Sequence, residues 1–219
     1  SLSLLRLAEI CAECGLPDGV LNVVTGQGSV TGEAIATSMD VDVLVFTGSG
    51  GVGRALLEYS ARSNLKRVYL ELGGISPTVV FADAPDLEQA AKVSAMGIFR
   101  NSGQVCVAGS RLIVEDSIHG EFVAAVSRHA KALKVGDPLD LNTQIGAINS
   151  EVQLKGNLGF VSDAIKEGNT IALGGAQILA ETGGYYMEPT IITDVEPHHR
   201  VSREEVFGPV LAVTSFKSD

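Results

Sequence analysis

The chain has 219 residues, 45% of them hydrophobic and 19% charged, a composition that predicts a packed core and excludes a disordered chain. Its formal net charge of −10 argues against a nucleic-acid binder, whose phosphate contacts need clustered Lys and Arg. No apolar run reaches the roughly 18 residues of a membrane span, and three cysteines favour a reducing, cytoplasmic setting over a disulfide framework.

The hydrophobic pattern alternates between helical and strand periods along the chain. Helices are predicted over residues 3–14, 31–38, 52–63, 86–102, 118–133 and 152–168. Strands or extended segments are predicted over residues 20–26, 41–47, 67–72, 76–85, 111–117, 171–175, 185–195 and 203–216. This order predicts an α/β fold, a parallel sheet with flanking helices, in which the β-branched run at 41–47 is buried.

A glycine-rich turn follows the predicted strand at 41–47 and precedes a predicted helix. Residues 48–53, GSGGVG, satisfy G-x-G-x-x-G, whose glycines let a backbone approach a pyrophosphate at a helix N-terminus. The alternative is a plain glycine-rich turn, because the pattern is weak in a chain with 25 glycines. From the residues alone, Glu71 at the end of the next strand is most simply interpreted as a ribose-binding acid.

The cysteines fall into two settings. Cys11 and Cys14 form C-x-x-C inside a predicted helix, but no second ligand pair accompanies them and the four histidines are not spaced to complete a site. We therefore predict no metal site there and interpret both as small apolar residues on a helix face. Cys106 lies in a loop of small residues, RNSGQVCVAGS, either as an inert thiol or as a nucleophile served by a carboxylate base.

Four motifs then occur in a fixed order: FTGS, ELGG, G-Q-x-C and E-x-F-G-P. In this order they resemble the NAD(P)-dependent aldehyde dehydrogenases, and the similarity runs over the whole chain. The resemblance implies that residues 1–72 are the C-terminal part of an NAD(P)-binding Rossmann-like domain. It implies that residues 73–219 are a catalytic thiol domain truncated at its C-terminal end, so the fold is expected to be incomplete at both ends.

The resemblance also assigns roles to single residues. It makes Cys106 the catalytic nucleophile and Glu71 the general base, in place of a ribose ligand. Residues expected to bind the cofactor are Gly48, Ser49, Gly53, Leu72, Gly73, Glu205 and Phe207. Within this set, Ser49 contacts the phosphates, and Glu205 and Phe207 position the nicotinamide ribose and ring. Ile75 stands where the family commonly has Lys, at a position that is not catalytic.

The implied reaction is oxidation of a small-molecule aldehyde to a carboxylic acid with NAD or NADP, through a thiohemiacetal and a thioester on the cysteine. The presence of Glu71 favours hydrolysis over transfer of the acyl group to coenzyme A. The alternative is a catalytically inactive fragment that acts only as a partial fold or interaction module. A weaker third hypothesis is thiol esterase activity without cofactor. The full-length parent is expected to be a homo-oligomer that binds neither nucleic acid nor membrane.

Overall fold

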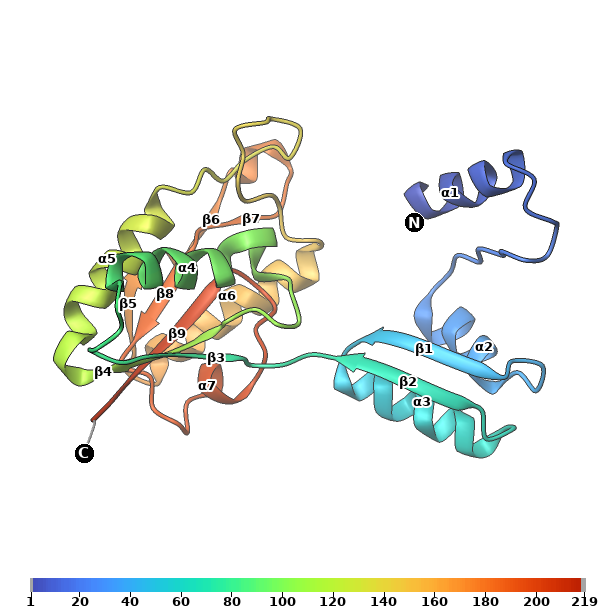
Figure 1. Ribbon diagram of the computed structural model, residues 1–219, viewed down its shortest axis with the longest axis horizontal. Coiled ribbons are helices and arrows are strands. Elements are labelled where there is room, and N and C mark those ends of the chain that lie inside the picture. The colour runs from blue at the N-terminus through green and yellow to red at the C-terminus, as the bar shows by residue number, and fades with distance from the viewer. Residues whose placement is uncertain (1, 218–219) are drawn as a thin grey trace. The chain divides into compact units, whose positions relative to one another are not determined.

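The computed structural model describes residues 2–217. Internal contacts divide the chain into two compact units, Ser1–Leu72 and Gly73–Asp219, which we call unit 1 and unit 2. Figure 1 shows unit 1 in blue to cyan and unit 2 in green to red. Each unit has its own helices; the described part of unit 1 has one two-stranded sheet, and that of unit 2 has a five-stranded and a two-stranded sheet.

Unit 1 is built around two strands and the helix that connects them. Its elements are α1 (Leu2–Glu13), the π-helical turn η1 (Gly28–Gly32), α2 (Glu33–Thr37), β1 (Val43–Gly48), α3 (Gly50–Arg62) and β2 (Arg67–Leu72). β1 and β2 pair in parallel, so that Thr47 lies beside Glu71 and Gly48 beside Leu72. A parallel pair needs a crossover connection, and α3 supplies it.

The strand predicted over residues 20–26 is wrong. These residues form no strand, and Val20 and Val24 are 65% and 69% exposed. A β-branched run becomes a strand only where a neighbouring strand and a core receive it, and the described residues place neither beside this segment.

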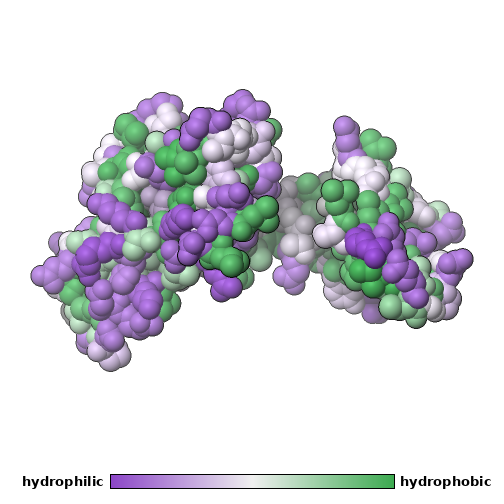
Figure 2. All heavy atoms as spheres, turned by 90° about the horizontal axis from the view of Figure 1, so that it is seen from above, coloured by the Kyte–Doolittle hydropathy of each residue, from purple (hydrophilic) through white to green (hydrophobic). Residues whose placement is uncertain are grey.

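β1 is less buried than the sequence predicts. Along β1 and β2, exposed residues alternate with half-buried ones, because α3 covers one face of the pair. On the other face, Val43, Val45 and Tyr69 are 49%, 69% and 53% exposed. Hydrophobic residues, green in Figure 2, accordingly reach the visible surface of unit 1. The prediction of a buried strand at 41–47 is therefore wrong: no residue of β1 is buried, and the face under α3 is only half-buried.

A buried lysine connects α2 to the start of β2. Lys66 is only 5% exposed, and its Nζ donates to the Ala36 carbonyl oxygen at 2.5 Å and to Ser63 Oγ at 2.9 Å. Ala36 lies in the last turn of α2, where backbone carbonyls lack partners within the helix. The Lys66 ammonium group therefore gives a carbonyl at the C-terminal end of α2 a hydrogen-bond donor, and its positive charge interacts favourably with the negative end of the helix dipole.

Replacing Lys66 with methionine should destabilise unit 1 by about 1.5–3 kcal/mol, the usual range for hydrogen bonds to a charged group. Native-state hydrogen exchange of the β1, β2 and α3 amides would measure the loss. The exposed neighbour Arg67, changed to methionine, is the control and should alter the free energy of unfolding by no more than about 0.5 kcal/mol. Equal losses in the two variants would contradict the role of Lys66.

Unit 2 contains a five-stranded sheet with helices on both faces. Its helices are α4 (Leu87–Phe99), α5 (His119–Lys131), α6 (Glu151–Lys166) and α7 (Arg200–Arg203), with 3-10 turns η2 (Arg100–Gly103), η3 (Asp116–Ile118) and η4 (Ala180–Thr182). Its strands are β3 (Pro77–Val80), β4 (Arg111–Glu115), β5 (Thr170–Leu173), β6 (Gln177–Ile178), β7 (Tyr186–Met187), β8 (Thr190–Thr193) and β9 (Val210–Phe216).

The strand order in this sheet is β3-β4-β9-β8-β5, and its first four strands are parallel. This confirms the predicted α/β class. β5 is the exception, since it pairs with β8 antiparallel. The connection from β5 to β8 holds only the β6–β7 hairpin and a 3-10 turn, with no crossover helix to return the chain in parallel.

Two apolar cores lie on opposite faces of the sheet. On β9, Leu211 and Val213 pack with α4 and α5, while Val210 and Ala212 pack with α6. Because side chains alternate across a strand, β9 contributes to both cores, which makes unit 2 a three-layer structure (Figure 1). Among residues 2–217, no helix is long and apolar enough to cross a membrane.

Candidate active site

The glycine-rich turn of unit 1 forms the N-terminus of α3. Ser49 adopts an extended backbone (φ −74°, ψ 150°) and its Oγ accepts a hydrogen bond from the Val52 N–H at 3.4 Å. α3 begins at Gly50, two residues before the predicted start at residue 52. The early start follows from Ser49, since a serine side chain is a preferred N-cap.

Gly53 serves helix–strand packing. Its N–H donates to the Ser49 carbonyl at 3.0 Å, and a Cβ at this position would lie 2.9 Å from Leu72 Cδ2. The absence of a side chain therefore lets α3 pack closely on β2. At Gly51, by contrast, a Cβ would meet nothing within 4 Å, so the start of the helix is open. Unpaired N–H groups at an accessible helix N-terminus fit a phosphate.

Glu71 and Leu72 lie at the carboxyl end of β2, beside Thr47 and Gly48 at the carboxyl end of β1. Glu71 is exposed, while Leu72 is half-buried on the α3 side. In open α/β sheets, ligands bind outside the carboxyl ends of the strands. Unit 1 thus brings Gly48, Ser49, Glu71 and Leu72 to one end of its sheet.

In unit 2, Cys106 follows an unusual left-handed turn. Asn101 (φ 52°), Ser102 (φ 56°) and Gly103 (φ 69°) are all left-handed, a conformation that costs about 1–2 kcal/mol for each non-glycine residue. Asn101 Nδ2 donates to the Gln104 carbonyl at 3.0 Å, and Ser102 Oγ donates to the Gly146 carbonyl at 2.8 Å. Strain of this kind persists only where surrounding contacts enforce it, and it clusters at functional sites.

Gly103 brings the Cys106 loop against the E-x-F-G-P segment. A Cβ on Gly103 would lie 2.0 Å from the Gly208 carbonyl oxygen and 2.8 Å from the Pro209 nitrogen, so only glycine allows this contact between backbones. The loop that carries the half-buried Cys106 also borders Gly74, since a Cβ on Gly74 would lie 3.3 Å from the Cys106 carbonyl oxygen. Two motifs separated by about a hundred residues therefore meet within unit 2.

The Glu205 carboxylate lies on the backbone of Gly73 and Gly74. The Gly74 N–H donates to Glu205 Oε1 at 3.0 Å. A Cβ on Gly73 would lie 1.8 Å from Glu205 Oε2, so any side chain at Gly73 would displace the carboxylate. Unit 2 thus brings the Glu205 carboxylate to the backbone of Gly73 and Gly74, and the Cys106 carbonyl oxygen to Gly74.

Two amide side chains on α6 hold the turn that carries Phe207. Gln153 Nε2 donates to the carbonyls of Val206 (2.9 Å) and Phe207 (3.2 Å), and the fully buried Asn157 amide lies 3.0 Å from the Val206 carbonyl. These contacts support the left-handed backbone of Phe207 (φ 54°). The sequence prediction missed both residues, although two amides four positions apart on an apolar helical face were a usable signal.

The sequence profile of the aldehyde dehydrogenase family matches residues 1–219, the whole chain. The chain belongs to the aldehyde dehydrogenase family. It is 46% identical over 218 residues to the NADP/NAD-dependent aldehyde dehydrogenase PuuC of Escherichia coli, and covers 43% of that protein. It is 47% identical over 219 residues to the peroxisomal aminoaldehyde dehydrogenase 1 of Pisum sativum, again over 43% of its length.

Solved aldehyde dehydrogenase structures agree with this assignment. The aldehyde dehydrogenase KauB of Pseudomonas aeruginosa matches 97% of the chain with a TM-score of 0.95 and 46% identity. An indole-3-acetaldehyde dehydrogenase in complex with NAD+ matches the same share with a TM-score of 0.95 and 47% identity. The chain spans 43% of each of these structures, less than half the length of the relatives it matches.

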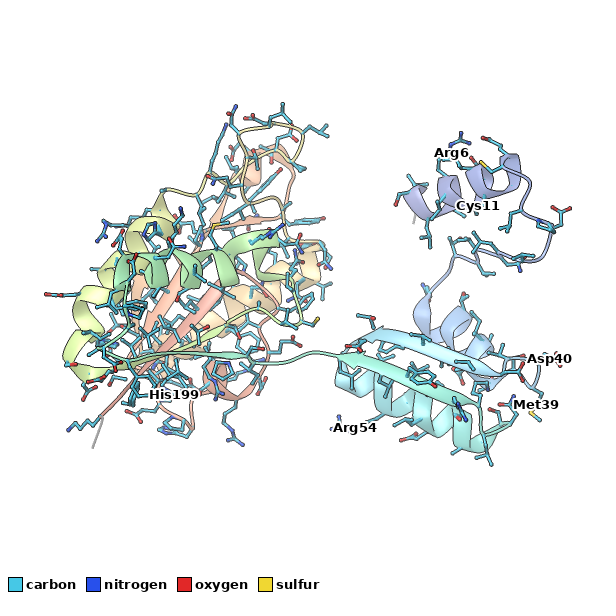
Figure 3. The ribbon with its side chains drawn as sticks, viewed as in Figure 1. Arg6, Cys11, Met39, Asp40, Arg54 and His199 are labelled. Carbon is cyan, nitrogen blue, oxygen red and sulfur yellow. The ribbon has the colours of Figure 1, made fainter. Side chains whose placement is uncertain are left out.

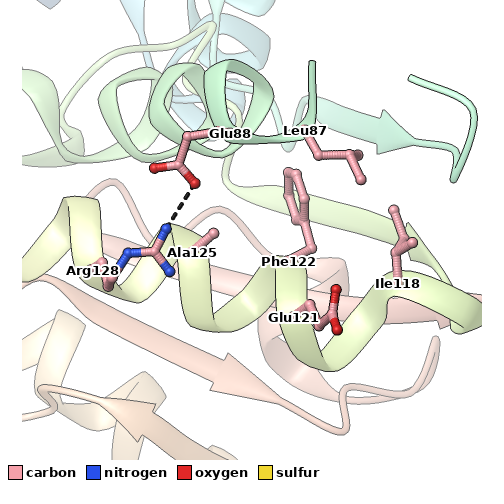
Figure 4. A pocket seen from close by; sticks show the side chains of 7 residues that line it. All are labelled: Leu87, Glu88, Ile118, Glu121, Phe122, Ala125 and Arg128. Carbon is pink, nitrogen blue, oxygen red and sulfur yellow. Dashed lines mark hydrogen bonds and ion pairs between the residues drawn. The ribbon is translucent and has the colours of Figure 1, made fainter. Parts of the chain in front are cut away.

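Other features of this aldehyde dehydrogenase chain lie apart from the predicted site residues. Cys11 is half-buried on α1 (Figure 3), whereas Cys14 is exposed just beyond the helix, so the expectation that both lie on a helix face is wrong for Cys14. Within residues 2–217, no group of His, Cys, Asp and Glu could hold a metal ion. A hollow between α4 and α5 contains the Glu88–Arg128 ion pair at 2.7 Å (Figure 4), and no predicted site residue lines it.

Changing Gly103 to alanine should destabilise unit 2 by about 3 kcal/mol, because left-handed strain adds to a clash with a backbone carbonyl. Urea unfolding followed by circular dichroism would measure the change. Gly168→Ala is a matched control: φ is +90° there, but a Cβ meets nothing within 4 Å, so only the strain of about 1 kcal/mol remains. A Gly103 variant no less stable than the Gly168 variant would contradict the proposed close contact.

Proposed function

We propose that the complete protein in which this chain occurs oxidises an aldehyde to a carboxylic acid with NAD or NADP. The observation that carries the proposal is the meeting, in unit 2, of the Cys106 loop with Gly74 and with the E-x-F-G-P segment. Similarity to relatives named NADP/NAD-dependent aldehyde dehydrogenase or solved in complex with NAD+ supports the choice of cofactor. Residues 1–72 and 73–219 are proposed as the cofactor and catalytic parts.

Both units contain groups that fit a nicotinamide dinucleotide. In unit 1, Ser49 and the open N-terminus of α3 would hold phosphate, with Gly48 in the turn before Ser49 and Gly53 allowing α3 to pack closely on β2. In unit 2, Glu205 would bind the ribose hydroxyls, Phe207 would border the ring and Gly73 would offer backbone groups. Leu72, the last residue of unit 1, would offer backbone groups as well. The bound cofactor supplies the acceptor for the hydride of the aldehyde.

Cys106 and Glu71 are proposed to perform the two covalent halves of the reaction. The Cys106 thiolate adds to the aldehyde carbonyl and gives a thiohemiacetal, whose oxyanion the Cys106 backbone N–H can stabilise. Loss of hydride from the carbon and collapse of the oxyanion leave a thioester on Cys106. Glu71 then removes a proton from water, which attacks the thioester, releases the acid and restores the thiolate. The exposure of Glu71 at a strand end supports this role, because water reaches it.

The test is a stoichiometric assay of the complete protein with propanal and either cofactor. We expect reduced cofactor, measured by absorbance, and propanoate, measured by chromatography, in equal amounts. Reduced cofactor without acid would contradict hydrolysis, and absence of both products with either cofactor would contradict the proposed function. The same assay on the 219-residue chain alone tests the alternative that this part is inactive by itself.

The cellular compartment, the partners and the oligomeric state of the complete protein are also proposals. Cys11, Cys14 and Cys106 are all free thiols, which supports a reducing, cytoplasmic compartment. The net charge of −10 supports a partner set without nucleic acid. Assembly of the complete protein as a homo-oligomer is proposed from the family resemblance, and light scattering of the purified protein would test it.

A further inference from the structure

Cys11 and Cys14 lie one helical turn apart at the C-terminal end of α1 (Figure 3). The helical hydrogen bonds continue past Glu13, because the Cys14 N–H donates to the Ile10 carbonyl oxygen at 2.9 Å. The rise and radius of an α-helix then place the two cysteine Cα atoms about 5 Å apart. Disulfides join Cα atoms that lie about 4.4–6.8 Å apart. The pair therefore already has the backbone spacing of a disulfide.

The end of α1 holds this pair in place and leaves it room to close. The Leu16 N–H donates to the Cys11 carbonyl oxygen at 3.0 Å, and the Gly15 N–H donates to the Ala12 carbonyl oxygen at 2.9 Å. Gly15 is left-handed (φ +89°), and a Cβ there would meet nothing within 4 Å. A disulfide needs the two Cβ atoms about 1–2 Å closer than they are in a regular helix. The unpacked last turn can supply this movement.

Packing does not account for the two cysteines. A cysteine that serves as a small apolar residue is usually buried. No described residue of α1 is buried, Cys11 is half-buried and Cys14 is exposed. A metal does not account for them either, because none of the described groups of His, Cys, Asp and Glu could hold one. Two free thiols thus stand side by side with neither a core nor a metal to explain them.

We infer that Cys11 and Cys14 form a site of reversible thiol–disulfide exchange, whose reaction partner is a small disulfide such as glutathione disulfide. The exposed Cys14 thiolate bonds to one sulfur of the small disulfide, whose S–S bond breaks and releases one thiolate. The Cys11 thiolate then bonds to the Cys14 sulfur and displaces the second thiolate. The protein loses two electrons and two protons, and the small disulfide is reduced to two thiols.

Cys106 provides a comparison within the same chain. Unit 2 contains no second cysteine, so exchange at Cys106 stops at the mixed disulfide with the small thiol. At the pair, Cys11 resolves that intermediate. In a reducing compartment such disulfides are transient, so the pair is expected to be reduced at rest and oxidised when the ratio of disulfide to thiol rises. This inference does not depend on the function proposed for Cys106.

The first test equilibrates the complete protein with reduced and oxidised glutathione at several ratios. Acid quenching, alkylation with N-ethylmaleimide and peptide mass spectrometry then report each cysteine. We expect the peptide with Cys11 and Cys14 to lose two hydrogen atoms and both alkylation sites as the ratio rises, and excess reduced glutathione to reverse this. Cys106 should carry glutathione instead. Alkylation of both paired cysteines at every ratio, a lasting glutathione adduct on Cys14, or a disulfide between two copies of the chain would overturn the inference.

Two variants test the order of attack and the spacing. Cys11→Ser should trap glutathione on Cys14, because the resolving thiol is gone. The double variant Glu13→Cys with Cys14→Ser keeps two thiols but sets them two positions apart, where helical side chains do not face each other. Its ratio of internal disulfide to dithiol should be about tenfold lower or more in the same buffer. An equal ratio in the natural protein and the double variant would overturn the role of the helical spacing.

A third measurement involves no oxidation. Phenylarsine oxide bonds to two neighbouring thiols through arsenic and releases its oxygen as water. We expect one arsenic atom on the Cys11–Cys14 peptide, retained against excess mercaptoethanol and removed by ethanedithiol. In Cys11→Ser, mercaptoethanol alone should remove it. Removal by mercaptoethanol from the natural protein as well would overturn the pairing. Neither this result nor the glutathione titration requires aldehyde oxidation, so each stands if the proposed function fails.

Discussion

Changing Cys106 to alanine is expected to reduce kcat/KM for aldehyde oxidation by about 10⁴-fold or more, because no other group of the chain is proposed to form the covalent bond to the substrate. Reduced cofactor would be followed by absorbance in the complete protein, with acid measured in parallel. Circular dichroism should show an unchanged fold, since Cys106 is only half-buried.

Cys14→Ala is the control for the Cys106 variant. Cys14 is an exposed free thiol in unit 1, so its loss should leave both the fold and the rate within a factor of about two. Substantial turnover in the Cys106 variant would remove the proposed nucleophile. It would then favour direct hydride transfer from a hydrated aldehyde.

Changing Glu71 to glutamine should lower steady-state turnover about 10²–10⁴-fold, the usual contribution of a general base. The first turnover should remain fast, because hydride transfer precedes hydrolysis. Rapid mixing is therefore expected to show a burst of reduced cofactor equal to the number of sites. Mass spectrometry should show the acyl group retained on Cys106.

The same experiment separates the two roles considered for Glu71. A ribose ligand would raise the KM for the cofactor and leave no acyl group on Cys106, whereas a general base would lower kcat and leave the thioester. Glu58, an exposed acid on α3, is the control and should show neither effect when changed to glutamine. Loss of the burst together with steady turnover would count against the hydrolytic role.

Much of the fold was predictable because its elements carry local signals. Residues 67–72 form β2 as predicted, and α4, α5 and α6 form where helical periodicity indicated them. The errors concern features that depend on distant partners. Residues 20–26 have the composition of a strand, but no strand of the described residues pairs with them. β5 runs antiparallel to β8 because a hairpin and a 3-10 turn, without a crossover helix, connect the two strands.

The candidate site likewise combines residues that carry a local sequence signal with contacts that depend on distant residues. Cys106, Glu71, Glu205 and Phe207 were found because each belongs to a short motif, and their roles remain predictions. The contact of Gly103 with Gly208 joins positions 105 apart, and the hydrogen bond of Gln153 to Val206 joins positions 53 apart. Local pattern can mark the two amides on α6, but it cannot identify their partners, because the contacts depend on how the sheet and α6 pack.

The left-handed turn before Cys106 has a consequence for the evolution of this protein. Positions 101–103 favour few residue types. Glycine adopts this left-handed backbone freely, and asparagine and aspartate adopt it at a smaller energetic cost than other side chains do. Val105 and Val107 follow on the same loop without this restriction, because neither has a positive φ. Substitutions at Val105 and Val107 can therefore change the surface beside the Cys106 thiol without straining the turn that precedes it.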